Sequence, residues 1–133
     1  MTAVGAAVAT HGRTWAQWLC LGGGAALVAR CTVGVALDPD FAVPGEGWHQ
    51  LFHLSSGVAL LAIAGNARWA LTGVLAFAAV YGLITVAGIV DGQDVAGVIP
   101  IEASDNRIHT LFTLVSLGVG LATWRATARA APA

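Results

Sequence analysis

Charged residues are scarce in this chain of 133 residues. Only 10% of the residues are charged and 57% are hydrophobic, whereas about a quarter of the residues in an ordinary soluble domain carry charge. Lysine is absent, and the formal net charge is -1. The low charge argues against a soluble domain, and the missing basic surface excludes nucleic acid as a partner.

Cysteine and proline are also rare. The two cysteines, Cys20 and Cys31, lie in one apolar run; on a helix they are about 16 Å apart, too far for a disulfide. Their spacing does not match a zinc ribbon, so we expect packed thiols, with a metal role for Cys31 as the alternative. None of the four prolines lies inside an apolar run, which argues against the discontinuous helices of a small transporter.

Four long apolar runs are the main feature that is present. They cover residues 15–37, 48–67, 69–90 and 106–124. Each has about 19 to 23 residues, and about 20 apolar residues in a helix cross the hydrocarbon core of a bilayer. The sequence therefore predicts an all-α fold, a four-helix transmembrane bundle that forms a single integral-membrane domain over residues 1–133, with the lipid bilayer as its main partner.

The charges sort by membrane side. The N-terminal segment, the turn at 66–68 and the C-terminal tail carry four arginines and no acid, while all seven acids lie at 38–47 and 91–105. Arginine in short loops marks the cytoplasmic side, so both termini should be cytoplasmic and the acidic loops should face outward. Many Ala, Gly, Val and Arg residues without lysine are typical of a high-GC bacterium, which predicts a multi-pass protein of the bacterial cytoplasmic membrane.

An internal repeat is suggested by two polar motifs. Placing His53 on His109 also places His49 on Asp105. Each half of the chain would then be a hairpin of two spans with an acidic outer loop. The bundle is accordingly predicted to consist of two similar helical hairpins, related by a pseudo-two-fold axis along the membrane normal.

The same motifs supply a candidate metal site. His49 and His53 are four residues apart, as are Asp105 and His109, so each pair lies on one face of its helix. Helical bundles hold Zn, Cu or Fe with imidazole and carboxylate ligands at this spacing, and haem held by two histidines is a further alternative. Because no nucleophile or activated base is recognisable beside these residues, we expect metal sequestration or delivery rather than catalysis.

A purely structural role for these residues is the competing interpretation. Asp105 would cap the fourth helix, His49 would be solvated at the interface, and His53 and His109 would form hydrogen bonds across the bundle. The protein would then be a non-catalytic accessory subunit or assembly factor of a membrane complex. Its partners would be other membrane subunits or further copies of itself.

Two further polar residues lie within the apolar runs. Arg30 is about 10 Å inside the outer end of the first span, so it should snorkel or pair with Asp105 or Glu102; binding of an anionic ligand or a lipid phosphate is the alternative. Tyr81, in the middle of the third span, is expected to be a packed residue with one hydrogen bond.

Two segments carry a resemblance to a known family: WHQLFHLSSG at 48–57 and IEASDNRIH at 101–109. They resemble a domain-of-unknown-function family of small four-pass membrane proteins common in actinobacteria. In this family an Asn-x-x-His-x-x-x-His-Leu run with a following glycine lies in the second helix, and an Asp-Asn-x-Leu-His run opens the fourth. The matching residues are His49, His53, Gly57, Asp105, Asn106 and His109. Ile108 replaces the usual leucine and Thr113 replaces a common glycine. The resemblance implies the architecture and the polar residues without naming a reaction.

Overall fold

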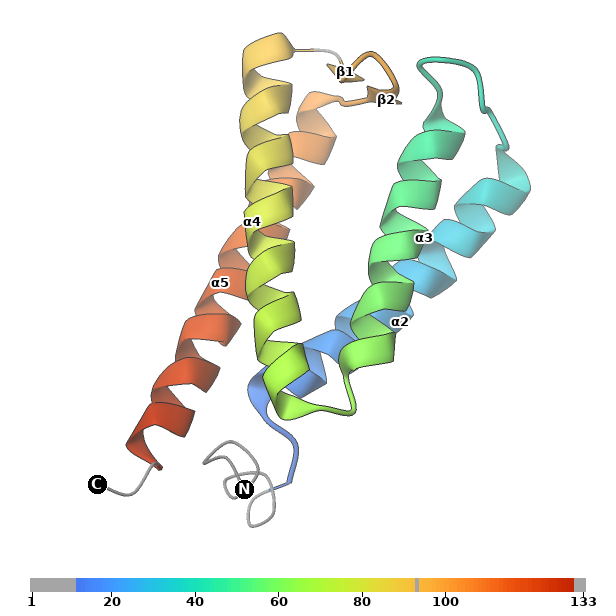
Figure 1. Ribbon diagram of the computed structural model, residues 1–133. Coiled ribbons are helices and arrows are strands. Elements are labelled where there is room, and N and C mark those ends of the chain that lie inside the picture. Colours follow the sequence, from blue (N-terminus) through green and yellow to red (C-terminus); the bar gives the residue numbers. More distant parts are fainter. Residues whose placement is uncertain (1–11, 93, 131–133) are drawn as a thin grey trace.

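Four helices dominate the computed structural model, which describes residues 12–92 and 94–130. They are α2 (Trp15–Leu37), α3 (Glu46–Ile63), α4 (Ala67–Asp91) and α5 (Ala103–Arg129). The α2–α3 and α4–α5 connections lie at one end of the molecule, here called the loop end, and the α3–α4 turn lies at the other, the turn end (Figure 1). The predicted helical fold with four helices is confirmed for the described residues.

Polar residues beside the apolar runs determine where the helices begin. The Asn66 side chain accepts hydrogen bonds from the backbone N–H groups of Arg68 and Trp69, at 3.0 and 3.1 Å, so α4 starts at Ala67. Glu102 and Asp105 form a reciprocal capping box, which starts α5 ahead of the predicted residue 106. Helix α3 likewise begins at Glu46 and ends at Ile63, earlier at both ends than predicted.

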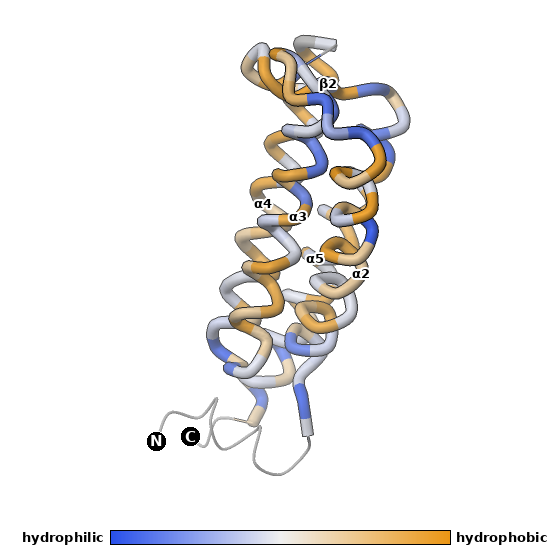
Figure 2. Tube along the Cα trace, turned by 90° about the vertical axis from the view of Figure 1, so that its right-hand side faces the viewer, coloured by the Kyte–Doolittle hydropathy of each residue, from blue (hydrophilic) through white to orange (hydrophobic). Residues whose placement is uncertain are grey.

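Three of these helices are long and apolar enough to cross a membrane: Trp15–Leu37, Ala67–Val90 and Ala103–Arg129. Helix α3 has 18 residues, or about 27 Å, and its first half carries Glu46, His49, Gln50 and His53. Apolar residues lie along the whole length of the bundle (Figure 2), and side chains such as Leu83 and Leu114 are 71% and 62% exposed. So much exposed apolar surface indicates a lipid environment.

Close packing of backbones joins α2 to α3. A Cβ atom added at Gly24 would lie 2.9 Å from the carbonyl oxygen of Gly57, and one added at Gly57 would lie 2.9 Å from that of Gly24. Helices in lipid associate through such small residues, because lipid provides no hydrophobic drive for helix association. Helix α4 packs most extensively against α5.

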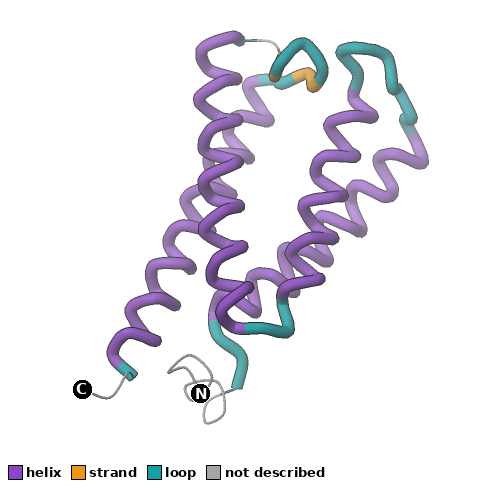
Figure 3. The backbone as a smooth tube through the Cα atoms, viewed as in Figure 1, coloured by secondary structure: helices purple, strands orange, loops and turns teal. Residues whose placement is uncertain are grey.

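Hydrogen bonds near the turn end join helices both between and within the two helix pairs, α2 with α3 and α4 with α5. The backbone N–H of Ala16 donates to Thr123 Oγ1 at 3.1 Å, which links α2 to α5. Gln17 Nε2 donates to the carbonyl of Ala64 at 3.0 Å, just after α3. Toward the loop end the two pairs move apart (Figure 3), and the polar residues of α3 and α5 lie in this region.

A short antiparallel β-hairpin, which the sequence did not predict, covers the loop end. Strands β1 (Asp94–Val95) and β2 (Ile99–Pro100) pair with Asp94 opposite Pro100. The turn between them includes Gly97, at φ 71°, whose N–H donates to the Asp94 side chain. The N–H of Gly45 donates to the carbonyl of Val98 at 3.2 Å, so this hairpin holds the start of α3 beside the start of α5.

Candidate metal centre

Three histidines meet below this hairpin. His49 and His53 lie on successive turns of α3, and His109 enters from α5, with His53 and His109 each about 10 Å along the axis from the start of its helix. The exposed fractions of the three side chains are 4%, 9% and 2%. The structure brings these three histidines together, whereas a solvated His49 is wrong, because this residue is buried.

The ring nitrogens point at one another. His53 Nε2 lies 2.9 Å from His49 Nε2 and 3.3 Å from His109 Nε2, and one ligand atom from each histidine lies within 4.8 Å of the others. Nitrogen ligands at about 2.05 Å from a tetrahedral zinc are about 3.3 Å apart. The separation of His53 from His109 matches this value, whereas the separation of His53 from His49 is shorter and lies within hydrogen-bond range.

The opposite ring nitrogens of two histidines have their own partners. His49 Nδ1 lies 3.3 Å from Glu46 Oε2, and His53 Nδ1 lies 2.7 Å from the hydroxyl oxygen of Tyr81. Tyr81 is fully buried on α4, where its ring stacks on Phe77 with centroids 4.1 Å apart. Such outer partners fix the orientation of metal-binding imidazoles.

These partners constrain the tautomers. The Glu46 carboxylate only accepts hydrogen bonds, so His49 carries its proton on Nδ1 and presents a lone pair at Nε2. If His53 donates from Nδ1 to the Tyr81 oxygen, it presents a second lone pair to the same centre. His109 Nδ1 is buried without a partner, and if this nitrogen carries the proton of the ring, Nε2 of His109 presents a third lone pair. All three Nε2 lone pairs then face inward, which is the state a metal ion requires.

Without a metal, hydrogen bonds among the rings are less complete. His49 Nε2 must accept, so His53 must donate from Nε2, and its Nδ1 then accepts from Tyr81. His53 has a single N–H at Nε2, which lies 2.9 Å from His49 Nε2 and 3.3 Å from His109 Nε2. His109 therefore accepts at most the longer, weaker branch of one shared hydrogen bond. A purely hydrogen-bonded cluster is feasible but leaves His109 poorly bonded.

Asp105 lies at the margin of this cluster. It lines a cavity of about 260 Å³ together with the three histidines, Arg30, Cys31 and Glu46, among others. One carboxylate oxygen, Oδ2, accepts from the backbone N–H of Glu102 at 2.8 Å. Asp105 thus has the capping function proposed for it, although at the third position of the helix, and the N-cap is Glu102.

A second cavity lies next to this site at the loop end. It has a volume of about 560 Å³ and is lined by four carboxylate residues among others: Asp40, Glu46, Glu102 and Asp105. Glu46 and Asp105 line both cavities. Clustered negative charge raises the local concentration of cations, so the arrangement provides an acidic approach to the histidines.

Arg30 does not pair as the sequence suggested. Among the described residues it forms no ion pair with Asp105 or Glu102, and its guanidinium donates only a long hydrogen bond, 3.4 Å, to Gln50 Oε1. Glu102 and Asp105 are engaged with each other at the start of α5, which leaves neither directed at Arg30. Both cysteines are free and buried, as expected of packed thiols.

Comparison with known proteins places the chain in a family. Residues 41–122 match the model of the family described as Domain of unknown function (DUF4383). The chain belongs to this family. No curated protein and no solved structure matches it.

Within the DUF4383 match lie the three histidines and Asp105, together with two site residues that sequence reasoning missed, Glu46 and Tyr81. The signal for Glu46 was its position three residues before His49 on the same helix face. Tyr81 had no comparable signal, because it reaches His53 only through the packing of α4 against the site. Arg30 lies outside the matched residues.

Proposed function

We propose that this protein binds a transition-metal ion, with Zn²⁺ the first choice and Cu or Fe the alternatives, on His49, His53 and His109, with Asp105 as a fourth ligand. The observation that carries the proposal is the convergence of three buried imidazoles, each of which offers one ligand nitrogen within 4.8 Å of the other two. Three histidines and one exchangeable or carboxylate position form a common zinc ligand set. We expect the task of this site to be holding or delivering metal rather than catalysing a reaction.

The membrane arrangement that we propose gives this site its direction. All four helices span a bacterial cytoplasmic membrane as two similar hairpins, with α3 as the fourth span and both termini cytoplasmic, because the arginines gather at the turn end. The loop end and its acidic cavity then face outward. Metal ions would reach the histidines from outside, past Glu46 and Asp105.

Metal content of the purified protein tests this function. After exposure to Zn²⁺ and removal of excess metal in detergent, the wild type should retain about one equivalent, and X-ray absorption should show nitrogen ligands at about 2.0–2.1 Å. His53→Ala and His109→Ala should lose this metal. Thr110→Ala is the matched control, since Thr110 is exposed next to His109 and bonds only to the carbonyl of Asn106 on its own helix.

Retention of metal by a His49→Ala/His53→Ala/His109→Ala variant, or no binding by the wild type, would contradict the proposal. The topology is tested separately, by labelling single introduced cysteines in intact cells. An Asp40→Cys variant should react with an impermeant reagent added outside, whereas an Ala128→Cys variant should react only after the cells are opened.

A second function is favoured by the same short distances. At 2.7 and 2.9 Å, the contacts of His53 with Tyr81 and His49 lie within hydrogen-bond range. The protein would then be a non-catalytic accessory subunit or assembly factor that uses its histidines to join helices, with other membrane subunits or further copies of itself as partners. This alternative predicts that His53→Ala lowers thermal stability equally with and without a chelator, and reduces recovery of a co-purifying subunit without changing metal content.

A further inference from the structure

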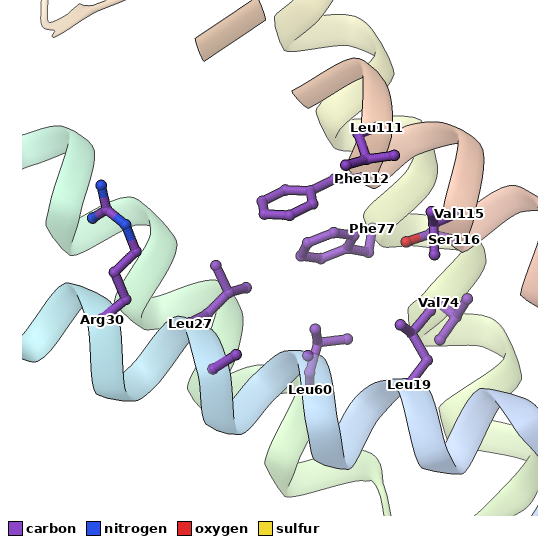
Figure 4. A pocket seen from close by; sticks show the side chains of 12 residues that line it. Leu19, Leu27, Arg30, Leu60, Val74, Phe77, Leu111, Phe112, Val115 and Ser116 are labelled. Carbon is purple, nitrogen blue, oxygen red and sulfur yellow. The ribbon is translucent and has the colours of Figure 1, made fainter. Parts of the chain in front are cut away.

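An apolar cavity lies between α2 and α5, separate from the polar site. It has a volume of about 320 Å³, and its lining includes Leu19 and Leu27 of α2, Phe112 and Val115 of α5, and Phe77 of α4. In Figure 4 these side chains surround an open space, and Arg30 lies at one end of it. None of the residues proposed to bind metal lines this cavity.

Only two lining residues carry polar side-chain groups, Arg30 and Ser116. Ser116 is 3% exposed, its oxygen is turned toward the cavity in Figure 4, and none of the hydrogen bonds of the described residues uses its side chain. An apolar molecule with a polar end suits this lining better than water does, because water in a cavity needs several polar partners.

Arg30 determines the charge of that polar end. No carboxylate of the described residues lies within ion-pair distance of its guanidinium. The nearby Glu46 carboxylate is already bonded, to His49 at 3.3 Å and to Gln50 at 2.7 Å. An arginine at this depth in a membrane protein needs an anion, and phosphate oxygens match the planar guanidinium donors.

The length of the cavity fits one acyl chain. Its lining on α2 runs from Leu19 to Arg30, a rise of about 16 Å, which is about half of the ~30 Å hydrocarbon core. Arg30 lies on the loop-end side of the cavity, about 10 Å inside the end of α2, so a phosphate bound there lies below the headgroup zone and the acyl chain extends from it past the middle of the helix.

We propose that this cavity is a binding site for one anionic phospholipid. Its acyl chain lies between α2 and α5, and its phosphate accepts hydrogen bonds from Arg30. A lipid with a net negative charge is required, since a zwitterionic headgroup brings no net charge to offset the guanidinium. Leu27, Arg30 and Phe112 line both this cavity and the one that contains the histidines, so the bound phosphate would lie near the mouth of the polar site.

Native mass spectrometry of the purified full-length protein tests the proposal, with the chelator EDTA present so that metal binding plays no part. The protein is incubated with equal amounts of phosphatidylglycerol and phosphatidylcholine of the same acyl chains. The wild type should retain one phosphatidylglycerol in preference to phosphatidylcholine. In Arg30→Gln this preference should fall about tenfold or more, as expected for loss of a charge-assisted hydrogen bond, while Arg30→Lys should keep part of it.

Two further variants make the result decisive. Gly23→Leu should abolish retention of both lipids, because a Cβ at Gly23 meets only Leu19 Cδ1, at 3.7 Å, and a larger side chain there projects into the space the acyl chain needs. Arg68 is an exposed arginine at the turn end, and Arg68→Gln should behave as the wild type.

Three results would overturn the proposal: equal retention of both lipids by the wild type, an unchanged preference in Arg30→Gln, or tighter binding of a free fatty acid than of phosphatidylglycerol. Metal retention by Arg30→Gln, measured separately, shows that its site is intact.

Discussion

The close approach of α2 to α3 makes a specific prediction about two glycines that are two residues apart. Gly24→Ala places a methyl group 2.9 Å from the carbonyl oxygen of Gly57 and 2.9 Å from Leu61 Cγ. Ordinary contacts of this kind are about 3.5–4.0 Å, so α2 and α3 must separate by several tenths of an ångström. Gly22→Ala adds the same methyl group to the same helix, where nothing lies within 4 Å.

The difference between these two variants isolates the packing cost. Replacing glycine by alanine within a helix stabilises it by about 1 kcal/mol, and this gain is common to both substitutions. Inserting a methyl group into a close-packed contact costs about 1–3 kcal/mol. Gly24→Ala should therefore be about 1–3 kcal/mol less stable than Gly22→Ala, while Gly22→Ala should equal or exceed the wild type.

Reversible unfolding in mixed micelles with increasing sodium dodecyl sulfate, followed by far-ultraviolet circular dichroism, measures both free energies of unfolding. Because α2 carries Arg30 and α3 carries two of the histidines, lipid and metal retention in Gly24→Ala would show how far the separation extends. Equal stability of the two variants would mean that α2 and α3 do not touch at Gly24 and Gly57, and the arrangement that positions the site would be wrong.

Three other predictions follow from single contacts. Tyr81→Phe removes the hydroxyl 2.7 Å from His53 Nδ1, so Zn²⁺ affinity should fall about 10- to 100-fold in competition with a chelator; an unchanged affinity would show that Tyr81 does not orient His53. Thr123→Val leaves the buried N–H of Ala16 without its acceptor and should cost about 1–3 kcal/mol of unfolding free energy, whereas Thr127→Val, which loses bonds only within its own helix, should cost less. Imidazole binds metal only when neutral, so acid strong enough to protonate the three rings should release the bound Zn²⁺, as measured by the metal content of the protein after acidification; retention of the metal once the rings are protonated would point to ligands other than histidine.

Sequence reasoning located the helices well but located their ends poorly. The apolar runs are long, and a run of about 20 apolar residues has few alternatives to a membrane-spanning helix. Helix ends depend on single polar contacts, such as the capping box of Glu102 with Asp105, which extended α5 beyond its apolar run. The short β-hairpin was missed because two-residue strands leave almost no pattern.

The part of the candidate site that lies on one helix could be predicted from the sequence, and the contacts between helices could not. His49 and His53 share a face of α3 by helix geometry alone, and their spacing was readable directly from the chain. Arg30 was expected to snorkel or to pair with Asp105 or Glu102, and the pairing is absent because those two residues bond to each other at the start of α5. Pairing among residues on different helices depends on competing partners, which a linear sequence does not rank.

By itself, the amino-acid sequence determined that this chain is helical, that its helices suit lipid, and that its acids and arginines gather at opposite ends, because these properties depend on composition and on spacing along one chain. Only the tertiary structure decided that His109 of α5 faces His49 and His53 of α3, that Tyr81 of α4 stands behind His53, and that a cavity between α2 and α5 ends at Arg30. Each of these contacts joins residues on separate helices. The distance between two helices depends on how closely their backbones approach at glycines such as Gly24 and Gly57. That approach is a property of the packed helices, and no local sequence pattern encodes it.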